Sequence, residues 1–181
     1  MKKVILAICV SAICVIGYSQ SGNNQIGVGA DLALPMGDFG DGVKTGFGGY
    51  AKGLFGIGEA GQITFTTGYS SFKLKGLDPD ESGTASIIPL LAGYRHNFSG
   101  FYVEPQVGYN IFGAKVKILG QSSSDSNGGF AYAIGLGYVV NNVDFGVRYQ
   151  GGKPSDSGGD SSDWSIIGIH VGYNFSLGGS K

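Results

Sequence analysis

The stretch that decides the fold covers residues 130–140 and reads FAYAIGLGYVV. Every second position holds a large apolar side chain, and the positions between hold mostly alanine and glycine. A period of two is that of a β-strand, in which successive side chains point to opposite faces. The segment therefore predicts a strand with one large apolar face, which consists of Phe130, Tyr132, Ile134, Leu136, Tyr138 and Val140.

The same period recurs in seven other segments, which gives eight strands of about ten residues each. That is the length a tilted strand needs to cross a bilayer. No segment with a helical period lies between them, so neighbouring strands are expected to be antiparallel. The seven other predicted strands are 25–34, 46–55, 62–74, 86–96, 101–111, 143–150 and 164–177.

Composition supports a sheet and excludes other classes. Glycine supplies 35 of the 181 residues, and glycine is unfavourable inside helices. The chain has only 5 prolines and lacks a Gly-x-y period, which excludes collagen. Its content of 42% hydrophobic residues excludes a disordered chain. The formal net charge of −1 provides no basic footprint for nucleic acid, so we expect no nucleic-acid partner.

The faces opposite the large apolar residues decide which way the sheet is oriented. They carry glycine and a few charged or ionisable side chains. An apolar outside around a polar inside is the arrangement of a transmembrane barrel, whereas a soluble lipocalin-like barrel, the alternative, has the reverse. We predict an all-β, eight-stranded antiparallel up-and-down transmembrane β-barrel. The polar residues on the inward faces are Asp31, Lys52, Arg95, Glu104, Asp144, Arg148 and His170.

The predicted connections alternate in length, as in outer-membrane barrels. Ser99-Gly100 and Asn141-Asn142 are short enough for two-residue turns, and asparagine tolerates the positive φ of such turns. Pro89 and Pro105 lack the N–H of a ladder hydrogen bond, so bulges or strand ends are expected there. The long connections are expected at 35–45, 75–85, 112–129 and 151–163.

The first nineteen residues have the pattern of a secretory signal peptide. Lys2 and Lys3 precede an apolar run of 13 residues, 4–16, which is shorter than the roughly 20 residues of a membrane-spanning helix. Small residues precede Gln20, so residues 1–19 are expected to be removed and residues 20–181 to form the barrel domain. Both cysteines lie in the removed segment, so we expect no disulfide.

The last predicted strand carries the spacing polar-x-Gly-x-x-aromatic-x-apolar, formed by His170, Gly172, Phe175 and Leu177. With the eight strands, it makes the chain resemble the small outer-membrane β-barrel family that includes the OmpA transmembrane domain and OmpX. Residues 33–39, ALPMGDF, resemble porin-family members from Bacteroidota. The resemblance implies export to the outer membrane of a Gram-negative cell, where the barrel-assembly machinery recognises this terminal pattern as its assembly signal.

The strand register set by a short turn predicts which charged residues meet inside the lumen. A two-residue turn at Ser99-Gly100 puts Arg95 opposite Glu104, both pointing inward, where a pair avoids the cost of isolated buried charges. We expect the other inward polar residues, Asp31, Lys52, Asp144, Arg148 and His170, to extend this pair into a network. Eight strands enclose little more than side chains, so polar groups are expected to plug the lumen. The alternative is a narrow porin-like channel for ions or small solutes.

No arrangement in the sequence predicts catalysis. The two histidines, His96 and His170, do not accompany a Ser and Asp pattern, and they form no metal-binding spacing. We therefore predict no catalytic residue, no cofactor and no metal, and a monomer with a structural or surface-interaction role. A lipid-modifying barrel enzyme is a less favoured alternative.

Four lysines gather at one sector of the predicted outer rim. Lys73 and Lys75 end the third strand, and Lys115 and Lys117 continue past the fifth. All four have the parity of the lipid-facing side, and ammonium groups attract phosphates. We hypothesise that they contact lipopolysaccharide, besides the outer-membrane lipids around the barrel. The alternative is ordinary interfacial lysines whose stems lie along the apolar wall.

Overall fold

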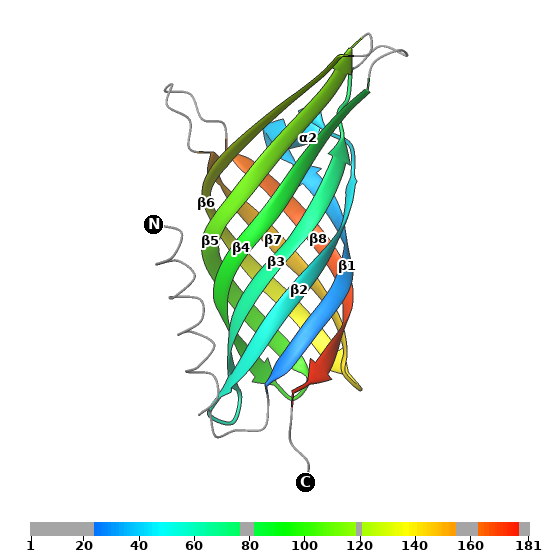
Figure 1. The fold of residues 1–181 in the computed structure, drawn as a ribbon. Coiled ribbons are helices and arrows are strands. Elements are labelled where there is room, and N and C mark those ends of the chain that lie inside the picture. The colour runs from blue at the N-terminus through cyan, green and yellow to red at the C-terminus, as the bar shows by residue number, and fades with distance from the viewer. Residues whose placement is uncertain (1–23, 77–81, 119–120, 155–162, 178–181) are drawn as a thin grey trace.

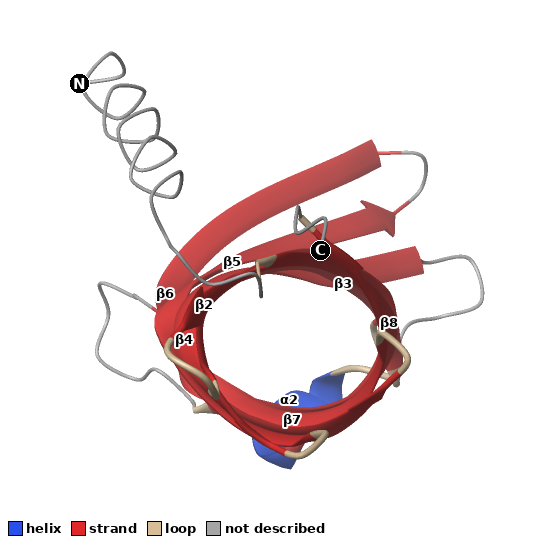
Figure 2. Ribbon diagram, turned by 90° about the horizontal axis from the view of Figure 1, so that it is seen from below, coloured by secondary structure: helices blue, strands red, loops and turns tan. Residues whose placement is uncertain are grey.

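The computed structural model describes residues 24–76, 82–118, 121–154 and 163–177, so the expected signal peptide lies outside the described residues. Eight strands form one closed barrel in which each strand pairs antiparallel with its sequence neighbours and the first pairs with the last (Figures 1 and 2). This confirms the predicted up-and-down barrel. The strands are β1 (Gln25–Met36), β2 (Gly46–Ile57), β3 (Gly61–Lys73), β4 (Ser82–Phe98), β5 (Phe101–Ile118), β6 (Gln121–Val140), β7 (Val143–Pro154) and β8 (Trp164–Ser176).

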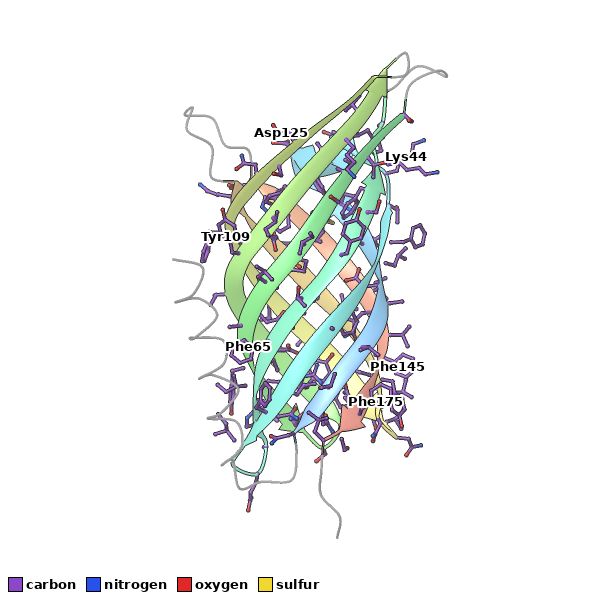
Figure 3. The ribbon with its side chains drawn as sticks, in the orientation of Figure 1. Lys44, Phe65, Tyr109, Asp125, Phe145 and Phe175 are labelled. Atoms are coloured by element: carbon purple, nitrogen blue, oxygen red, sulfur yellow. The ribbon has the colours of Figure 1, made fainter. Side chains whose placement is uncertain are left out.

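The alternation of side chains turns the apolar face outward. Phe101 is 65% exposed, whereas its neighbour Tyr102 is 2% exposed and points into the barrel. Figure 3 shows Tyr109, Phe145 and Phe175 projecting from the outer wall. Such an apolar outer surface is stable against lipid and not against water.

No helix among the described residues is long and apolar enough to cross a bilayer.

Inward-facing glycines make room for side chains that cross the lumen and for the backbone of adjacent strands. A Cβ atom on Gly172 of β8 would lie 2.2 Å from the hydroxyl oxygen of Tyr50, whose ring crosses the inner wall. A Cβ atom on Gly108 would lie 2.1 Å from the backbone oxygen of Leu90. Part of the glycine excess therefore allows side chains and backbone atoms to approach the inner wall closely in a narrow barrel.

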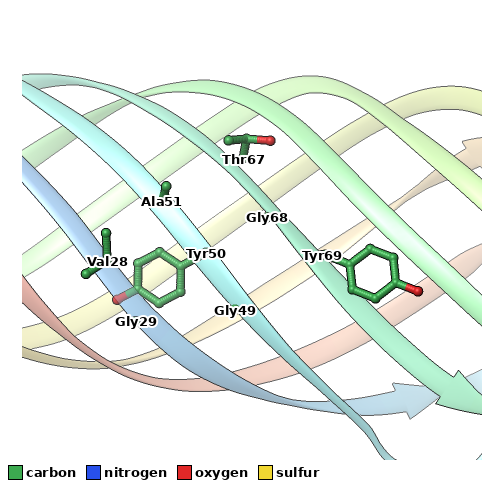
Figure 4. Close-up of a pocket in the computed structure, with 8 residues that line it drawn as sticks. All are labelled: Val28, Gly29, Gly49, Tyr50, Ala51, Thr67, Gly68 and Tyr69. Atoms are coloured by element: carbon green, nitrogen blue, oxygen red, sulfur yellow. The ribbon is translucent and has the colours of Figure 1, made fainter.

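Small residues also occur on the outer wall. Gly49 and Ala51 of β2 lie between Val28 of β1 and Tyr69 of β3, around a hollow of about 660 Å³ (Figure 4). The membrane-facing wall is thus uneven, because the small residues leave space that the large side chains elsewhere fill.

Short turns join the strands at one end, here called the turn end, and the other connections lie at the opposite end, here called the loop end (Figure 1). Both predicted two-residue turns are present. Ser99 and Gly100 have φ of 53° and 102°, and Asn141 and Asn142 have φ of 48° and 71°. These positive angles fit the twist of the flanking strands.

The largest departure from the predicted fold is at the loop end of β4, β5 and β6. Residues 112–129 were expected as a connection, but β5 continues to Ile118 and β6 begins at Gln121. β4 likewise starts at Ser82 instead of Ser86. These three strands rise beyond the rest of the barrel in Figure 1. In β6, residues 121–129 are polar or glycine on both faces, so they lack the period that reveals a strand. In β5 the period continues, but from Phe112 onward the apolar residues lie at the inward positions instead of the outward ones.

The expectation of bulges or strand ends at the two prolines is wrong. The β3–β4 ladder lacks pairs between Thr67↔Leu90 and Ser70↔Ile87, beside Pro89, but keeps the same register on both sides. The β4–β5 ladder has a similar two-pair interruption beside Pro105. A missing N–H removes hydrogen bonds without changing the number of residues, so the register continues.

The expected connection at 35–45 contains a short helix, α2 (Gly37–Gly42). Its Phe39 packs edge-on against Phe72 of β3, with ring centroids 5.5 Å apart. The first connection is therefore folded against the barrel at the loop end (Figure 2).

Candidate functional site

The lumen contains two layers of side chains. Near the turn end lies a polar cluster, and nearer the loop end lies an apolar layer built mainly from β1, β3, β4, β6 and β8. The polar cluster consists of Lys52, Arg95, Tyr102, Glu104, Gln106, Asp144, His170 and Asn174. The apolar layer consists of Ala33, Val43, Phe72, Ile87, Leu91, Ala131, Ala133, Trp164 and Ile166.

Arg95 of β4 is the centre of the polar cluster and is 1% exposed. Its Nη2 and Nε donate to Glu104 Oε2 at 2.7 and 2.9 Å, and its Nη1 donates to Asp144 Oδ2 at 3.0 Å. The guanidinium carbon lies 3.5 Å from the centre of the Tyr102 ring. One cation thus joins two carboxylates and an aromatic face, an arrangement suited to the planar guanidinium.

Glu104 of β5 extends the polar cluster across the lumen. Lys52 Nζ, from β2, donates to Glu104 Oε2 at 2.8 Å. Gln106 Nε2 donates to the other carboxylate oxygen at 2.9 Å and to Thr66 Oγ1 at 2.9 Å. Because β2 and β5 are not neighbours in the sheet, these contacts fill the interior between opposite walls.

Asp144 of β7 connects the cluster to the last strand. Tyr102 Oη donates to Asp144 Oδ1 at 2.7 Å, and Asn174 Nδ2 donates to Oδ2 at 3.3 Å. His170 Nε2 lies 3.1 Å from Tyr102 Oη and 3.6 Å from Asp144 Oδ1. Tyr50 contacts the His170 ring edge-on. These contacts join β2, β5, β7 and β8 through one carboxylate and its neighbours.

A second ion pair lies apart from the first. Arg148 Nη2 donates to Asp31 Oδ2 at 3.0 Å, which joins β7 to β1. With this pair, the buried charges comprise three basic and three acidic side chains among the described residues. An equal number of opposite charges in contact lowers the large cost of removing each from water.

The predicted lumen residues are thus all buried in the barrel, but in two groups instead of one network. Three further lumen residues were not predicted, although they bond directly to the predicted charges: Tyr102, Gln106 and Asn174. Strand parity could have identified them, since Tyr102 and Gln106 lie two residues from Glu104. The contact of Lys52 with Glu104 has no such signal, because it joins strands that do not pair.

Nearer the loop end, apolar side chains fill the lumen beside buried polar ones such as Gln150, whose Nε2 donates to Asn110 Oδ1 at 3.1 Å. Leu91 and Ile87 share the inward parity of Arg95 and are each 2% exposed, yet they are apolar. Phe112 packs edge-on against Trp164 at 5.1 Å, which extends the apolar layer toward the loop end. Apolar side chains can fill a lumen without the desolvation cost of polar groups, so both kinds of layer occur.

The chemistry of the site is charge neutralisation and packing. Within the described ranges, no three His, Cys, Asp or Glu side chains gather in a metal-binding arrangement. The hydrogen bonds of the polar cluster run mainly between its own side chains and across the lumen.

The lysines of the predicted rim separate into two groups. Lys73 and Lys115 both pair with Thr84, on either side of β4, and both have the outward parity. Lys75 follows β3, and its Nζ donates to the backbone oxygen of Gly40 in α2 at 2.6 Å. Lys117 belongs to β5, but its side chain is outside the described part of the chain.

The residues of the predicted assembly signal lie on different faces of the last strand. His170 is buried in the lumen, and Gly172 lies on the same inner face. Phe175 is exposed on the outer wall near the turn end, and Leu177 follows the end of β8.

Comparison with known proteins agrees with the fold. The family model described as "Outer membrane protein beta-barrel domain" matches residues 5–175. No curated protein matches the sequence significantly.

Several solved structures resemble the chain, at identities that indicate a shared fold. Ail, the attachment invasion locus protein of Yersinia pestis, is 19% identical, with 86% of this chain and 100% of that chain covered and a TM-score of 0.62. Neisserial surface protein A is 20% identical, with coverages of 87% and 98% and a TM-score of 0.58. The N-terminal barrel of Pseudomonas aeruginosa OprF is 14% identical, with coverages of 86% and 100% and a TM-score of 0.55.

Because the charges of the polar cluster are buried and paired, we expect removal of one of them to lower the stability of the barrel strongly. Glu104→Gln leaves Lys52 and Arg95 with one fewer carboxylate, and we expect the free energy of unfolding to fall by about 3–5 kcal/mol. Urea unfolding in lipid vesicles, followed by the fluorescence of the single tryptophan, Trp164, measures this change. The control is Asp163→Asn, which removes an exposed partner of Lys153 and is expected to change stability by less than about 1 kcal/mol. Equal stabilities of the two variants would contradict the account.

Proposed function

Because the chain belongs to the outer membrane protein beta-barrel domain family, we propose that it is an integral outer-membrane protein that mediates interactions at the cell surface through its loop end. In this proposal side chains close the lumen, so ions and small solutes do not pass through it. Residues 1–19 serve as a cleaved signal peptide, and the barrel functions as a monomer.

The observation that carries the proposal is the extended hairpin of β5 and β6. β6 pairs with β7 only from Gly129 onward, although it pairs with β5 from Gln121. Among the described residues, the β6 backbone over 121–128 therefore has a strand on one side alone. An unpaired strand edge outside the membrane is a surface to which another chain can add by backbone hydrogen bonds.

The known structures support a surface role. Ail is described as an attachment invasion locus protein, and one structure of Ail contains the heparin analogue sucrose octasulfate. The family and its neighbours are structural and adhesin-type barrels, so we propose a non-enzymatic role for this chain as well.

The contents of the lumen support closure. A charge-balanced cluster near the turn end and an apolar layer near the loop end lie in series along the barrel. An ion would have to displace the bonds of Arg95 and then cross apolar side chains, where an unpaired charge is costly. A narrow porin-like channel is the alternative that these two layers disfavour.

The assembly pattern enters this proposal as a recognition element. Phe175 is exposed on the outer wall near the turn end, so its ring is available to a protein that binds the last strand during insertion. We propose the barrel-assembly machinery as that partner.

A second contact proposed here is with lipopolysaccharide. Lys73 and Lys115 lie two strands apart across Thr84, a separation of about 10 Å at the usual strand spacing. Two outward ammonium groups at that distance suit the phosphates of one lipid A headgroup. Lys117 extends the same rim, whereas Lys75 contributes less, because its ammonium is bonded to α2.

Attachment tests the surface role. Cells displaying the wild-type chain are expected to bind surfaces coated with an extracellular-matrix protein better than cells without it, since a polypeptide partner can pair with the β6 edge. A variant lacking residues 114–125, with 113 and 126 joined by a two-residue turn, is expected to lose most of this binding, because the free edge of β6 is removed. The count of attached cells is the measurement, and heat-modifiable migration on gels checks that the barrel is intact. Full binding by the shortened variant would exclude the hairpin as the contact.

The lipid contact predicts a salt-sensitive loss of affinity. Replacing Lys73 and Lys115 by alanine is expected to weaken lipid A binding severalfold, because two charge-assisted contacts are lost. Binding of purified protein to lipid A, with and without its phosphates, measures this. Lys153→Ala, on β7 at the same end, is the matched control. The proposal is wrong if the double variant binds lipid A as tightly as the control does.

A further inference from the structure

The rising part of the barrel has a concave inner face made of two cross-strand rows. One row runs through Phe72, Ala85, Ala114 and Asp125, and the other runs through Ser70, Ile87, Phe112 and Asn127. Both rows have the parity that points into the lumen lower in the barrel. Because these strands extend beyond the others, this face continues the apolar layer from Phe72 and Ile87 toward the loop end, where Asp125 lies (Figure 3).

A cavity of about 170 Å³ lies on this face, between the rows and α2. The small side chains of Ala85 and Ala114 leave the space, while Ile87 and Phe112 line the next row. Phe39 of α2 closes the side toward β3, where it contacts Phe72. Asp125 lies at the opposite end of the cavity on β6.

Asp125 is the only charged side chain that lines this cavity among the described residues. Its Oδ1 accepts a hydrogen bond from the backbone N–H of Ser126 at 2.8 Å, and its Oδ2 has no partner within the described part of the chain. The nearby cations are directed elsewhere. Lys115 has the opposite parity, and Lys75 is bonded to Gly40.

A carboxylate at one end of a cavity lined by two aromatic rings suits an organic cation on an apolar stem, because the cation can pair with the carboxylate while the stem packs against the rings. The volume is below that of a drug-sized site, so it accommodates one short group instead of an extended molecule. We propose that this cavity binds an organic ammonium group on a short apolar stem, with the cation at Asp125 and the stem between Phe39 and Phe112. The site uses the concave face of the sheet and does not depend on the free edge of β6.

The protein contains its own reporter of binding. Trp164 is the single tryptophan, and its ring packs against Phe112, which lines the cavity. A stem in the cavity changes the surroundings of Phe112 and thereby the emission of Trp164. Benzylammonium is the probe, and benzyl alcohol is its neutral counterpart of nearly the same shape.

Titration of the full barrel in lipid nanodiscs tests the proposal. We expect saturable quenching or shift of Trp164 emission with benzylammonium and much weaker binding of benzyl alcohol. Asp125→Asn is expected to weaken benzylammonium binding about threefold to fivefold, which is the scale of an exposed ion pair. The matched control is Glu59→Gln, which removes an exposed carboxylate at the turn end and is expected to leave binding unchanged.

A second variant separates the cavity from partitioning into lipid. Ala85→Leu fills the hollow with an apolar side chain at an extramembrane position and is expected to abolish the saturable signal while the barrel remains folded. The proposal is overturned if benzylammonium gives no saturable signal, if Asp125→Asn binds as the wild type does, or if Ala85→Leu leaves binding intact.

The source of the ammonium group is distinguished by a parallel titration with blocked lysine, which carries the cation on a peptide backbone. Binding of blocked lysine as well as benzylammonium identifies a protein side chain as a ligand that fits. Binding of benzylammonium alone identifies free small amines. Both results support the site, because each requires an ammonium group at Asp125.

Discussion

Closure of the sheet is the constraint on which the rest of the structure depends. In a closed antiparallel barrel the strands satisfy one another's backbone groups, so a lipid-facing wall leaves no polar backbone edge within the bilayer. What can still vary along each strand is the type of side chain on its outward and inward faces. The outward face must be apolar, and the inward face must fill a narrow volume without leaving a charge unpaired. Arg95, bonded to both Glu104 and Asp144, meets this second requirement near the turn end of the lumen.

The two layers of the lumen follow from the same constraint. The three basic and three acidic groups are paired within two separate groups. Apolar residues such as Leu91 and Ile166, with the bonded polar pair Gln150 and Asn110, fill the remaining length. Above the membrane the constraint ends. The rising part of β5 therefore carries lysine at outward positions, and the rising part of β6 carries polar side chains on both faces. Within the described ranges, this part of β6 has a paired strand on one side alone. The features available for recognition, including the cavity beside Asp125, are consequently at the loop end.

The sequence was sufficient for the features that are set between neighbouring strands. Period two identified all eight strands, and the two-residue turns at Ser99-Gly100 and Asn141-Asn142 set their registers, which put Arg95 beside Glu104. It was not sufficient for contacts across the lumen, such as Lys52 with Glu104, because the register relates only strands that pair. The upper hairpin and α2 were missed because no lipid keeps apolar residues on the outward face there: in β5 they change to inward positions at Phe112, and β6 is polar over 121–127. The apolar layer was missed because its residues share the inward parity of the charges.

Single-channel recording of the purified barrel in planar bilayers tests the closed lumen most directly. Arg95, its two carboxylates and the apolar layer occupy the path in series, so the account predicts that insertion produces no sustained conductance. The variant shortened at the β5–β6 hairpin is predicted to behave in the same way, because closure lies within the barrel. Steady conductance steps that scale with the number of inserted wild-type molecules would contradict the account.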